Sequence, residues 1–568
     1  MTYRAPIAEI EFMLNEVLGA DQLTQTTLFE DVTEDLRSAI LREAAKLSEE
    51  VLAPLNVAGD LTPAKLENGV TRCSPGFADG YRAVADGGWV GMAAKPESGG
   101  MGLPMTLLVA VNEMMSSACL SLALNPLMTQ GQIEALEYHA SDEIKAVYLD
   151  KLISGQWTGT MNLTEAQAGS DVGALSTKAS DNGDGSFAIT GQKIFISWGD
   201  HDVAENICHL VLARLPDGAA GTRGISLFIV PKFIPDENGN PGVANTLHAV
   251  SLEHKMGLHG SPTAVMAFDG AKGWMIGAEN GGMAAMFTMM NNARLGVGIQ
   301  GLSQAEAAFQ KALAYAGDRK QGKSLVENGT GTIVDHADVR RNLMTMKTLT
   351  LSARAICLDT ALSLDLSRAL DGAEAEKHKA RAAFLTPIAK AFSTDIGCQV
   401  AELGVQVHGG MGYIEEAGAS QFYRDVRVTA IYEGTNGIQA MDLVGRKMKD
   451  GGTAAHAILA EITATAADAA PDVGNPLAAA VNSLTEATQY MLQADMNDRF
   501  AGAAPYLRAF ALALAGHYLL KSALKDPTRM PLARFHIRQT MQQVDALCSA
   551  AREGATTLYA LDMDGLAR

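Results

Sequence analysis

The sequence predicts a mainly α-helical protein with a central β-barrel-like domain. Apolar residues recur at helical spacing through roughly the first 155 residues. Short β-rich runs, separated by clusters of turn residues, then occupy about residues 157–280. Helical patterning returns from about residue 282 and continues to the end. Because strands and helices are segregated and do not alternate, this order disfavours a doubly wound nucleotide-binding fold.

The chain has 568 residues, which at roughly 150 residues per domain suggests about four units. The last boundary is expected where the chain turns Ala/Gly-rich and is then interrupted by PDV and GNP, near 450–470. The predicted units are an N-terminal helical domain (1–157), a β domain (158–280), a helical bundle (281–455) and an additional helical domain (456–568).

Individual elements follow from local patterns. In LRSAILREAAKLSEEVLAPLN, apolar residues repeat at helical spacing, namely Leu36, Ile40, Leu41, Ala44, Leu47 and Val51. A second apolar helix is expected in LLVAVNEMMSSACLSLAL. The expected strands are 187–197, 207–215, 225–231 and 263–270.

The charge balance and the spacing of cysteines exclude several classes of protein. Lys+Arg is 45 and Asp+Glu is 64, so the formal net charge is −19, which opposes non-specific binding to nucleic acid or to anionic membranes. The six cysteines form no CxxC pair and have no zinc-ligand spacing with a histidine, so no metal site is expected. No secretory leader is visible, and the late apolar run 509–516 is far shorter than the roughly 20 residues of a membrane span. A cytoplasmic location is expected.

Two segments match nucleotide-binding sequence patterns but lack the secondary structure that those motifs require. Gly296–Gly301 reads GxGxxG, and Gly317–Ser324 reads GxxxxGK[ST]. Both motifs work only after a buried strand, whereas each of these is preceded by a helical sequence. The sequence therefore predicts close helix packing at the first and a helix end at the second.

Four segments carry groups suited to a flat, phosphorylated cofactor and a base. LTEAQAGSD at 163–171 offers hydroxyl donors, and FISWG at 195–199 ends a strand with aromatic and hydroxyl groups. QVHGGMGY at 406–413 has paired glycines that let backbone amides approach a pyrophosphate. IYEGTNGIQ at 431–439 places one carboxylate in an apolar setting. Taken singly, each also fits an ordinary loop, strand end, helix stop or surface residue.

In order and spacing, the four segments together resemble the acyl-CoA dehydrogenase family over roughly residues 35–445. LTEAQAGSD is similar to the family's TEPGAGSD, QVHGGMGY to QxxGGxGY, and RDVRVTAIYEGTNGIQ to RDxxxxxIYEGTxxIQ. Two departures stand out: Ala166-Gln167 replaces Pro-Gly, and FDGAKGWMIG lacks the family's VPxxNxLG. The whole chain resembles a long subfamily with an added C-terminal helical domain.

The resemblance implies an acyl-CoA dehydrogenase-like fold and an FAD cofactor. By similarity, Arg319 and Gln321 reach the FAD of a neighbouring subunit, so the resemblance implies an oligomer, expected to be a homodimer. The other residues implied as FAD contacts are Thr164, Gly169, Ser170, Phe195, Ser197, Gln406, Gly409, Gly410, Thr435 and Gln439.

The resemblance assigns the catalytic base to Glu433, and the chemistry agrees. A base must remove an α-proton while a hydride leaves the β-carbon, and desolvation makes a carboxylate basic enough. Some relatives carry the base on an earlier helix, but that position is Ala293 here. Arg294, Ser170 and Gly434 are expected to contact substrate, with Arg294 facing either the CoA portion or nearby carboxylates.

The expected reaction is α,β-dehydrogenation of an acyl-CoA, with electrons passing to an electron-transfer flavoprotein. The subfamily resemblance favours a short acyl chain such as 3-methylthiopropionyl-CoA over a medium or long fatty acyl chain. An acyl-CoA oxidase is the alternative that uses oxygen. A DNA-associated alkylation-response flavoprotein is disfavoured, because residues 451–568 show no basic run.

Overall fold

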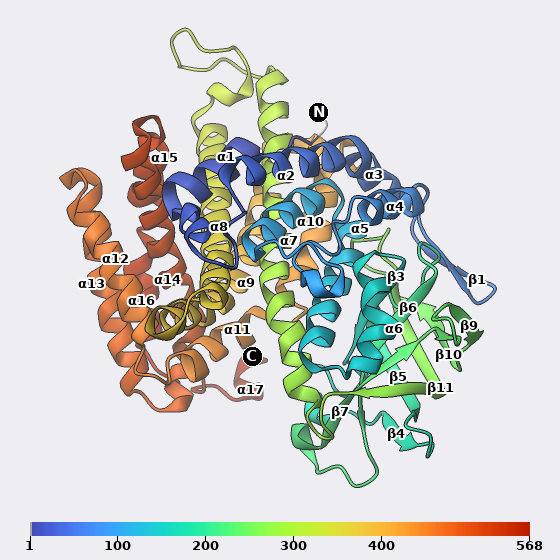
Figure 1. Cartoon of the computed structure of the whole chain (residues 1–568). Coiled ribbons are helices and arrows are strands. Elements are labelled where there is room, and N and C mark those ends of the chain that lie inside the picture. The colour runs from blue at the N-terminus through green and yellow to red at the C-terminus, as the bar shows by residue number, and fades with distance from the viewer. Residues whose placement is uncertain (1–2) are drawn as a thin grey trace.

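The computed structural model describes residues 3–568, apart from the side chain of Asn291, and confirms the predicted order of helical and β regions. Figure 1 shows N-terminal helices above the β domain, with a long-helix bundle beside them and the C-terminal helices on the far side of that bundle. The first region contains α1 (Ile7–Phe12), α2 (Glu34–Lys46), α3 (Ala53–Leu61), β1 (Lys65–Glu67), β2 (Val70–Arg72), α4 (Phe77–Asp86), α5 (Met105–His139) and α6 (Asp142–Ile153).

Helix α5 is the central rod of this first region. It is broken at Cys119, whose backbone is non-helical, and contains Pro126. The Trp198 indole donates to the Ser121 carbonyl at 3.1 Å, next to this break. Asp365 closes the helix N-terminus by accepting hydrogen bonds from Met105 N at 2.6 Å and Thr106 N at 2.8 Å. Among the described residues, α5 alone is long and apolar enough to cross a membrane, but its apolar window is completely buried inside the protein.

The β domain is one seven-stranded sheet whose pairings curl back on themselves. Neighbours run in the order β10-β11-β5-β4-β6-β3, and β7 pairs with both β6 and β11. A single residue pair, Lys178↔Arg214, joins β4 to β6. The strands are β3 (Trp157–Asn162), β4 (Lys178–Asp181), β5 (Phe187–Ser197), β6 (Asn206–Arg214), β7 (Ile225–Pro231), β8 (Phe233–Pro235), β9 (Pro241–Ala244), β10 (Leu247–Leu252) and β11 (Thr263–Ile276). β8 and β9 form a separate hairpin.

Three helices of more than thirty residues form the bundle: α7 (Gly282–Asp318), α8 (Ala337–Ala369) and α9 (Gly372–His408). α7 and α9 run parallel in contact. A Cβ added to Gly298 would lie 2.8 Å from the Ala389 carbonyl, and the rings of Tyr315 and His408 stack at 4.4 Å further along. The GxGxxG match lies inside α7, so its glycines serve helix packing, as predicted.

The second rejected motif also has the predicted setting. Gly317 and Asp318 end helix α7, and the rest of the match begins an exposed loop that projects beyond the bundle (Figure 1). The segment that leads directly into the match is a helix and not a strand, because residues 282–318 are one helix.

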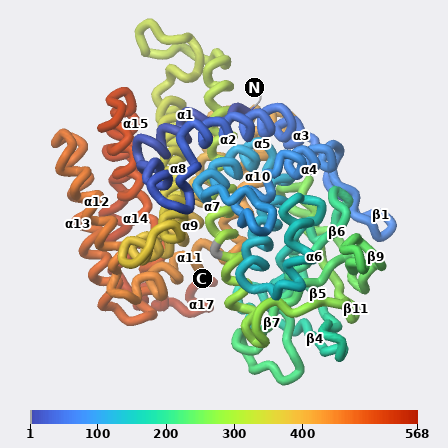
Figure 2. Tube along the Cα trace, in the orientation of Figure 1, coloured from blue at the N-terminus to red at the C-terminus, as the bar shows by residue number. Residues whose placement is uncertain are grey.

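The C-terminal helices pack against the bundle, as the trace in Figure 2 also shows. Arg381 of α9 binds Asp359 of α8 at 2.8 Å and Glu461 of α12 at 2.9 Å, and the Tyr518 hydroxyl of α14 donates to Asp359. The remaining helices are α10 (Ala419–Val426), α11 (Asn436–Asp442), α12 (Thr453–Ala467), α13 (Pro471–Gln493), α14 (Met496–Lys525), α15 (Met530–Phe535), α16 (Gln543–Ala551) and α17 (Met563–Leu566).

Candidate active site

Glu433 lies in a bend of residues 431–435, directly before helix α11. Its backbone is left-handed, with φ 54°, and Gly434 follows with φ 83°. A left-handed conformation costs a non-glycine residue about 1–2 kcal/mol, so the surrounding contacts must hold it. The Gln439 side-chain amide donates to the Glu433 and Gly434 carbonyls at 3.1 and 3.3 Å, and Thr435 caps α11. The bend therefore aims one carboxylate by means of a strained backbone.

The environment of Glu433 suits a general base. Burial raises the pKa of Glu433 to about 7, against the opposing effect of the positive charges of Arg294 and Lys390. A carboxyl group with a pKa near 7 is a far better base than one in water and is still largely ionised slightly above neutrality. The preceding Tyr432 donates from its hydroxyl to Gln300 on α7. The structure thus gives Glu433 both a fixed position and a raised basicity.

Arg294 lies deep in the bundle and contacts a carboxylate of the chain itself. It is only 5% exposed, and its Nη1 binds Asp442 at 3.0 Å. Of the two partners expected for Arg294, nearby carboxylates are the ones found here. Ala293, which takes the place of the base in some relatives, is buried beside it.

On the β-domain side, the loop at 163–170 is anchored by the buried carboxylate of its own residue Glu165. Glu165 accepts from Lys193 Nζ at 2.8 Å and from the Thr177 hydroxyl at 2.6 Å. Gln167 donates to the same carboxylate at 2.7 Å, so this departure from the family's Pro-Gly supplies its own support for the turn. Thr164 is half-buried, whereas Gly169 and Ser170 are exposed at the tip.

Phe195 and Ser197 end strand β5 beside that loop, where Ile194 N donates to the Thr164 carbonyl at 2.9 Å. The pairing of β5 with β11 shifts register between Lys193 and Ile196, which marks a bulge. Phe195 there has φ 60° and is 60% exposed, whereas Ile196 is buried. A large aromatic ring is thus held open to the surface by a left-handed backbone.

The remaining predicted FAD contacts lie at the other end of the α7–α9 pair. Asp318 lies 24 positions after Arg294 along helix α7, which corresponds to about 36 Å at 1.5 Å per residue. We call this far end the distal end. The predicted FAD contacts there are all exposed, namely Arg319, Gln321, Gln406, Gly409 and Gly410. One chain therefore does not bring them together with Glu433, Thr435 and Gln439.

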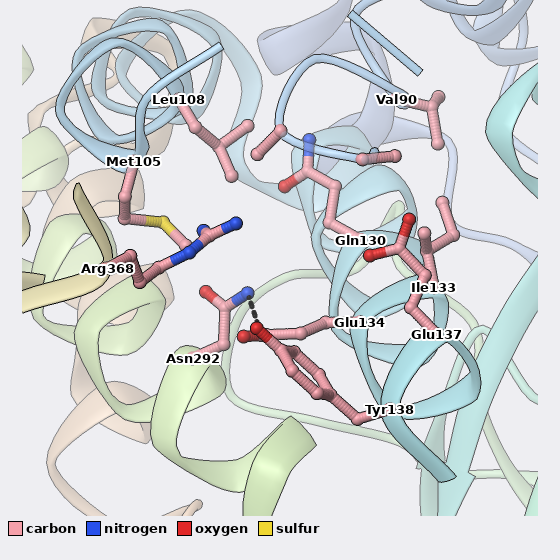
Figure 3. Close-up of a pocket in the computed structure, with 12 residues that line it drawn as sticks. Val90, Met105, Leu108, Gln130, Ile133, Glu134, Glu137, Tyr138, Asn292 and Arg368 are labelled. Atoms are coloured by element: carbon pink, nitrogen blue, oxygen red, sulfur yellow. Dashed lines mark hydrogen bonds between the residues drawn. The ribbon is translucent and has the colours of Figure 1, made fainter. Parts of the chain in front are cut away.

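A small polar pocket between α5, α7 and α8 is separate from this site (Figure 3). Glu134 accepts a hydrogen bond from Asn292 Nδ2 at 2.9 Å, and burial raises the pKa of Glu134. Arg368 and Gln130 line the same pocket. Its lining residues come from 90–138, from 292 and from 368, and not from the bend at 431–435.

Sequence reasoning missed two residues next to the base. Lys390 of α9 is buried, and its ammonium donates to Asn436 Oδ1 at 2.8 Å. A lysine in the helical stretch TPIAKAF gives no sign of burial. Asn436 lies within the IYEGTNGIQ segment, but only the fold brings it to α9.

Models of the acyl-CoA dehydrogenase family match the chain almost end to end. The N-terminal domain model matches residues 37–156, the middle domain model 160–271, and the C-terminal domain model 280–448. A fourth model, described as acetyl-CoA dehydrogenase C-terminal like, matches residues 458–562.

Individual relatives agree with these matches. The chain is 44% identical to a 3-methylmercaptopropionyl-CoA dehydrogenase of Ruegeria pomeroyi, over 92% of this chain and 91% of the relative. It is 36% identical to a butyryl-CoA dehydrogenase of Syntrophomonas wolfei, over 79% of this chain and 76% of the relative. The structure of Caenorhabditis elegans ACDH-11 in complex with C11-CoA matches with a TM-score of 0.81 at 19% identity, covering 99% of this chain and 96% of that one.

The fold and the half-buried carboxylate of Glu433 fit a thioester dehydrogenase of the helical–β–helical type. The chain belongs to the acyl-CoA dehydrogenase family, in the form that carries an extra C-terminal helical domain. It is an acyl-CoA dehydrogenase, as the resemblance of its four segments predicted.

Members of this family are FAD flavoproteins, and the residues present fit that cofactor. The exposed ring of Phe195 offers a flat apolar surface near the end of strand β5. At the distal end, a Cβ added to Gly409 or Gly410 would meet no atom within 4 Å, so these backbones face open space. Exposed backbone of this kind, at the same end of the helix pair as Arg319, suits a diphosphate.

Proposed function

We propose that the enzyme dehydrogenates a short acyl-CoA, such as 3-methylthiopropionyl-CoA, with Glu433 as the catalytic base. The observation that carries the role of Glu433 is its raised pKa of about 7 in a bend that two left-handed residues define. Glu433 removes the proton from the α-carbon, the β-hydrogen leaves as hydride, and the Cα–Cβ bond becomes double. The Glu433 N–H donates to the thioester oxygen as charge develops there.

FAD, when bound, supplies the hydride acceptor. Thr164, Ser170, Phe195 and Ser197 hold its ring system, and Thr435 and Gln439 fix the backbone that faces it. Arg319, Gln321, Gln406, Gly409 and Gly410 hold the diphosphate and adenosine part of FAD bound to a second subunit. The enzyme is then a homodimer that needs both chains for each cofactor.

The short chain is supported by the relatives and by the packing of α5 on α7. The named substrate of the Ruegeria relative has a short acyl chain. A Cβ added to Gly296 would lie 2.7 Å from Leu127 Cδ1, and one added to Gly131 would lie 3.0 Å from Met289 Cγ. These contacts lie within two turns of Arg294, so bulky side chains already fill the space between the helices near the base.

We also propose an electron acceptor and a cellular location for the enzyme. Electrons pass from the reduced enzyme to an electron-transfer flavoprotein, and the protein works in the cytoplasm. The net charge of −19 argues against nucleic acid or anionic membrane as a partner. These assignments rest on the family resemblance and on composition.

A panel of acyl-CoAs of increasing length tests the substrate. Holoenzyme is mixed anaerobically with 3-methylthiopropionyl-, butyryl-, octanoyl- and dodecanoyl-CoA, and bleaching of the flavin is followed. Fastest bleaching with the two short substrates is expected. Fastest bleaching with octanoyl- or dodecanoyl-CoA would contradict the short chain and favour a medium- or long-chain enzyme. Turnover with ferrocenium under anaerobic conditions, against turnover with oxygen, separates a dehydrogenase from an oxidase.

A further inference from the structure

Lys390 is a buried charge next to the catalytic bend that the reaction as described does not use. Lys390 lies three positions after Pro387 in helix α9, and it is 0% exposed. Its ammonium donates to the neutral amide oxygen of Asn436 at 2.8 Å. Among the described residues, no carboxylate lies within 4 Å of it as an ion pair. A buried ammonium without a paired carboxylate is costly, so its presence calls for a reason.

Asn436 connects Lys390 to the bend. It is the first residue of α11, three positions after Glu433, and its side chain lies on α9. Its Nδ2 donates to Asp395 Oδ1 at 2.6 Å and to the Ala391 carbonyl at 3.2 Å. Since the amide oxygen accepts from Lys390, the whole side chain is clamped against one turn of α9. The bend therefore cannot shift without breaking these contacts.

The charges around Glu433 are not equivalent. Arg294 is ion-paired with Asp442, which also binds Arg446 at 2.5 Å. Lys390 has no ion-pair partner of this kind in the described part of the chain. The charged and titratable groups that influence its pKa are Glu433, Asp395, Arg294 and Cys398. Burial lowers the pKa of Lys390 to about 8, against the attraction of Glu433 and Asp395. Its positive charge in turn lowers the pKa of Glu433, after the larger effect of Arg294.

We infer that Lys390 is a positioning residue for the dehydrogenation: through Asn436 it fixes the bend at 431–435, and through its charge it keeps the Glu433 carboxylate ionised. This inference rests on the proposed role of Glu433 as the base. The clamp explains how a strained left-handed glutamate is held in place. The charge explains how a largely desolvated carboxylate stays available as a base near neutral pH.

The test compares pH profiles of kcat/KM for wild type, Lys390→Met and Lys390→Arg holoenzymes. Ferrocenium serves as acceptor, with butyryl-CoA and 3-methylthiopropionyl-CoA as substrates, between pH 5.5 and 9.5. In Lys390→Met the acid limb should move up by about one pH unit, because the base loses a favourable charge. Lys390→Arg keeps the charge and should leave the limb within about 0.3 unit of wild type.

Lys447→Met is the matched control. Lys447 is a half-buried lysine near Asp442 and Arg294, but it does not act on Glu433. Its replacement should leave the acid limb unmoved. Asn436→Ala keeps both charges and releases the clamp, so kcat should fall at every pH while the limb stays near its wild-type position.

An unmoved acid limb in Lys390→Met would overturn the inference, as would an equal shift in Lys390→Met and Lys390→Arg. If Lys390→Met does not retain FAD, Lys390→Gln replaces it in the same comparison. Glu433→Gln separates this result from the proposed function. An active Glu433→Gln refutes the base itself, whereas an inactive one with an unmoved limb in Lys390→Met refutes only the role of Lys390.

Discussion

The two ends of the α7–α9 pair hold their functional residues in opposite ways. Around Glu433, the side chains of Arg294, Lys390 and Gln439 are buried and joined by hydrogen bonds within one chain. At the distal end, Arg319 and Gly409 are exposed, on a projecting loop and at a helix end. Groups that carry out proton transfer need a fixed and desolvated setting, whereas groups that await another molecule remain at the surface. The contacts of the buried end lie within one chain, whereas the exposed end presents the residues that the proposed second subunit would use.

The largest effect is expected at the buried end. Glu433→Gln keeps the shape of the side chain and removes the base, so the protein should stay yellow and lose dehydrogenation by at least 10²–10⁴-fold. Flavin bleaching by acyl-CoA measures the loss, and the visible spectrum checks FAD content. Activity near wild type would show that the buried end is not the catalytic end.

A change in the backbone of the same bend should have the next largest effect. Gly434 has φ 83°, and a Cβ there would lie 2.8 Å from Gln439 Nε2. Gly434→Ala should displace the base by a fraction of an ångström and lower kcat by about 10–100-fold. The control is Gly437→Ala, where an added Cβ would meet only Thr435 Oγ1 at 3.8 Å. Equal activities of the two variants would argue against a rigid bend.

Arg319→Ala tests the exposed end. Loss of a charge-assisted contact with the FAD diphosphate should weaken cofactor retention and oligomer stability together, because a ligand bound across subunits stabilises the assembly. Light scattering after size exclusion, combined with the FAD-to-protein ratio, measures both. A stable monomer that retains FAD would refute the shared site. A tetramer would refute only the expected homodimer and would leave the shared site intact.

The smallest effect is expected a few residues further along the same loop. Lys323 belongs to the phosphate-loop match, but a long helix precedes it instead of a strand. Lys323→Ala should leave activity within about twofold of wild type, and neither protein should bind ATP. ATP affinity that disappears in this variant would show the loop to be a nucleotide site after all.

Sequence patterns predicted the coarse fold and the residues of the family motifs. The runs at 187–197 and 225–231 coincide with β5 and β7, and the helical stretch from Leu36 continues through α2 to α3. Periodicity did not reveal β3 or β4, because Trp157–Asn162 is buried on both faces and Lys178–Asp181 is short. Asp365, which caps α5 from a helix more than two hundred residues away, has no local signal at all.

The same limit explains what was missed in the site. IYEGTNGIQ indicates a base through its residue types, but the two charges that act on the base come from Arg294 and Lys390, far earlier in the chain. Such a contact depends on how α9 packs against the start of α11. Likewise, the β-rich pattern of residues 187–197 predicts a strand but not the bulge that opens Phe195 to the surface.

The burial of α5 has a consequence for how this protein is made. On the ribosome, the 35 residues of α5 emerge with their 18-residue apolar window, but the main covering helix α7 begins only at Gly282, 143 residues after His139. At about 5–20 residues per second, the apolar segment therefore exists for about 7–30 s of translation before α7 begins to be made. During that interval the nascent chain displays the composition of a membrane insert. Helix α5 can therefore reach its completely buried state only after α7 has been synthesised.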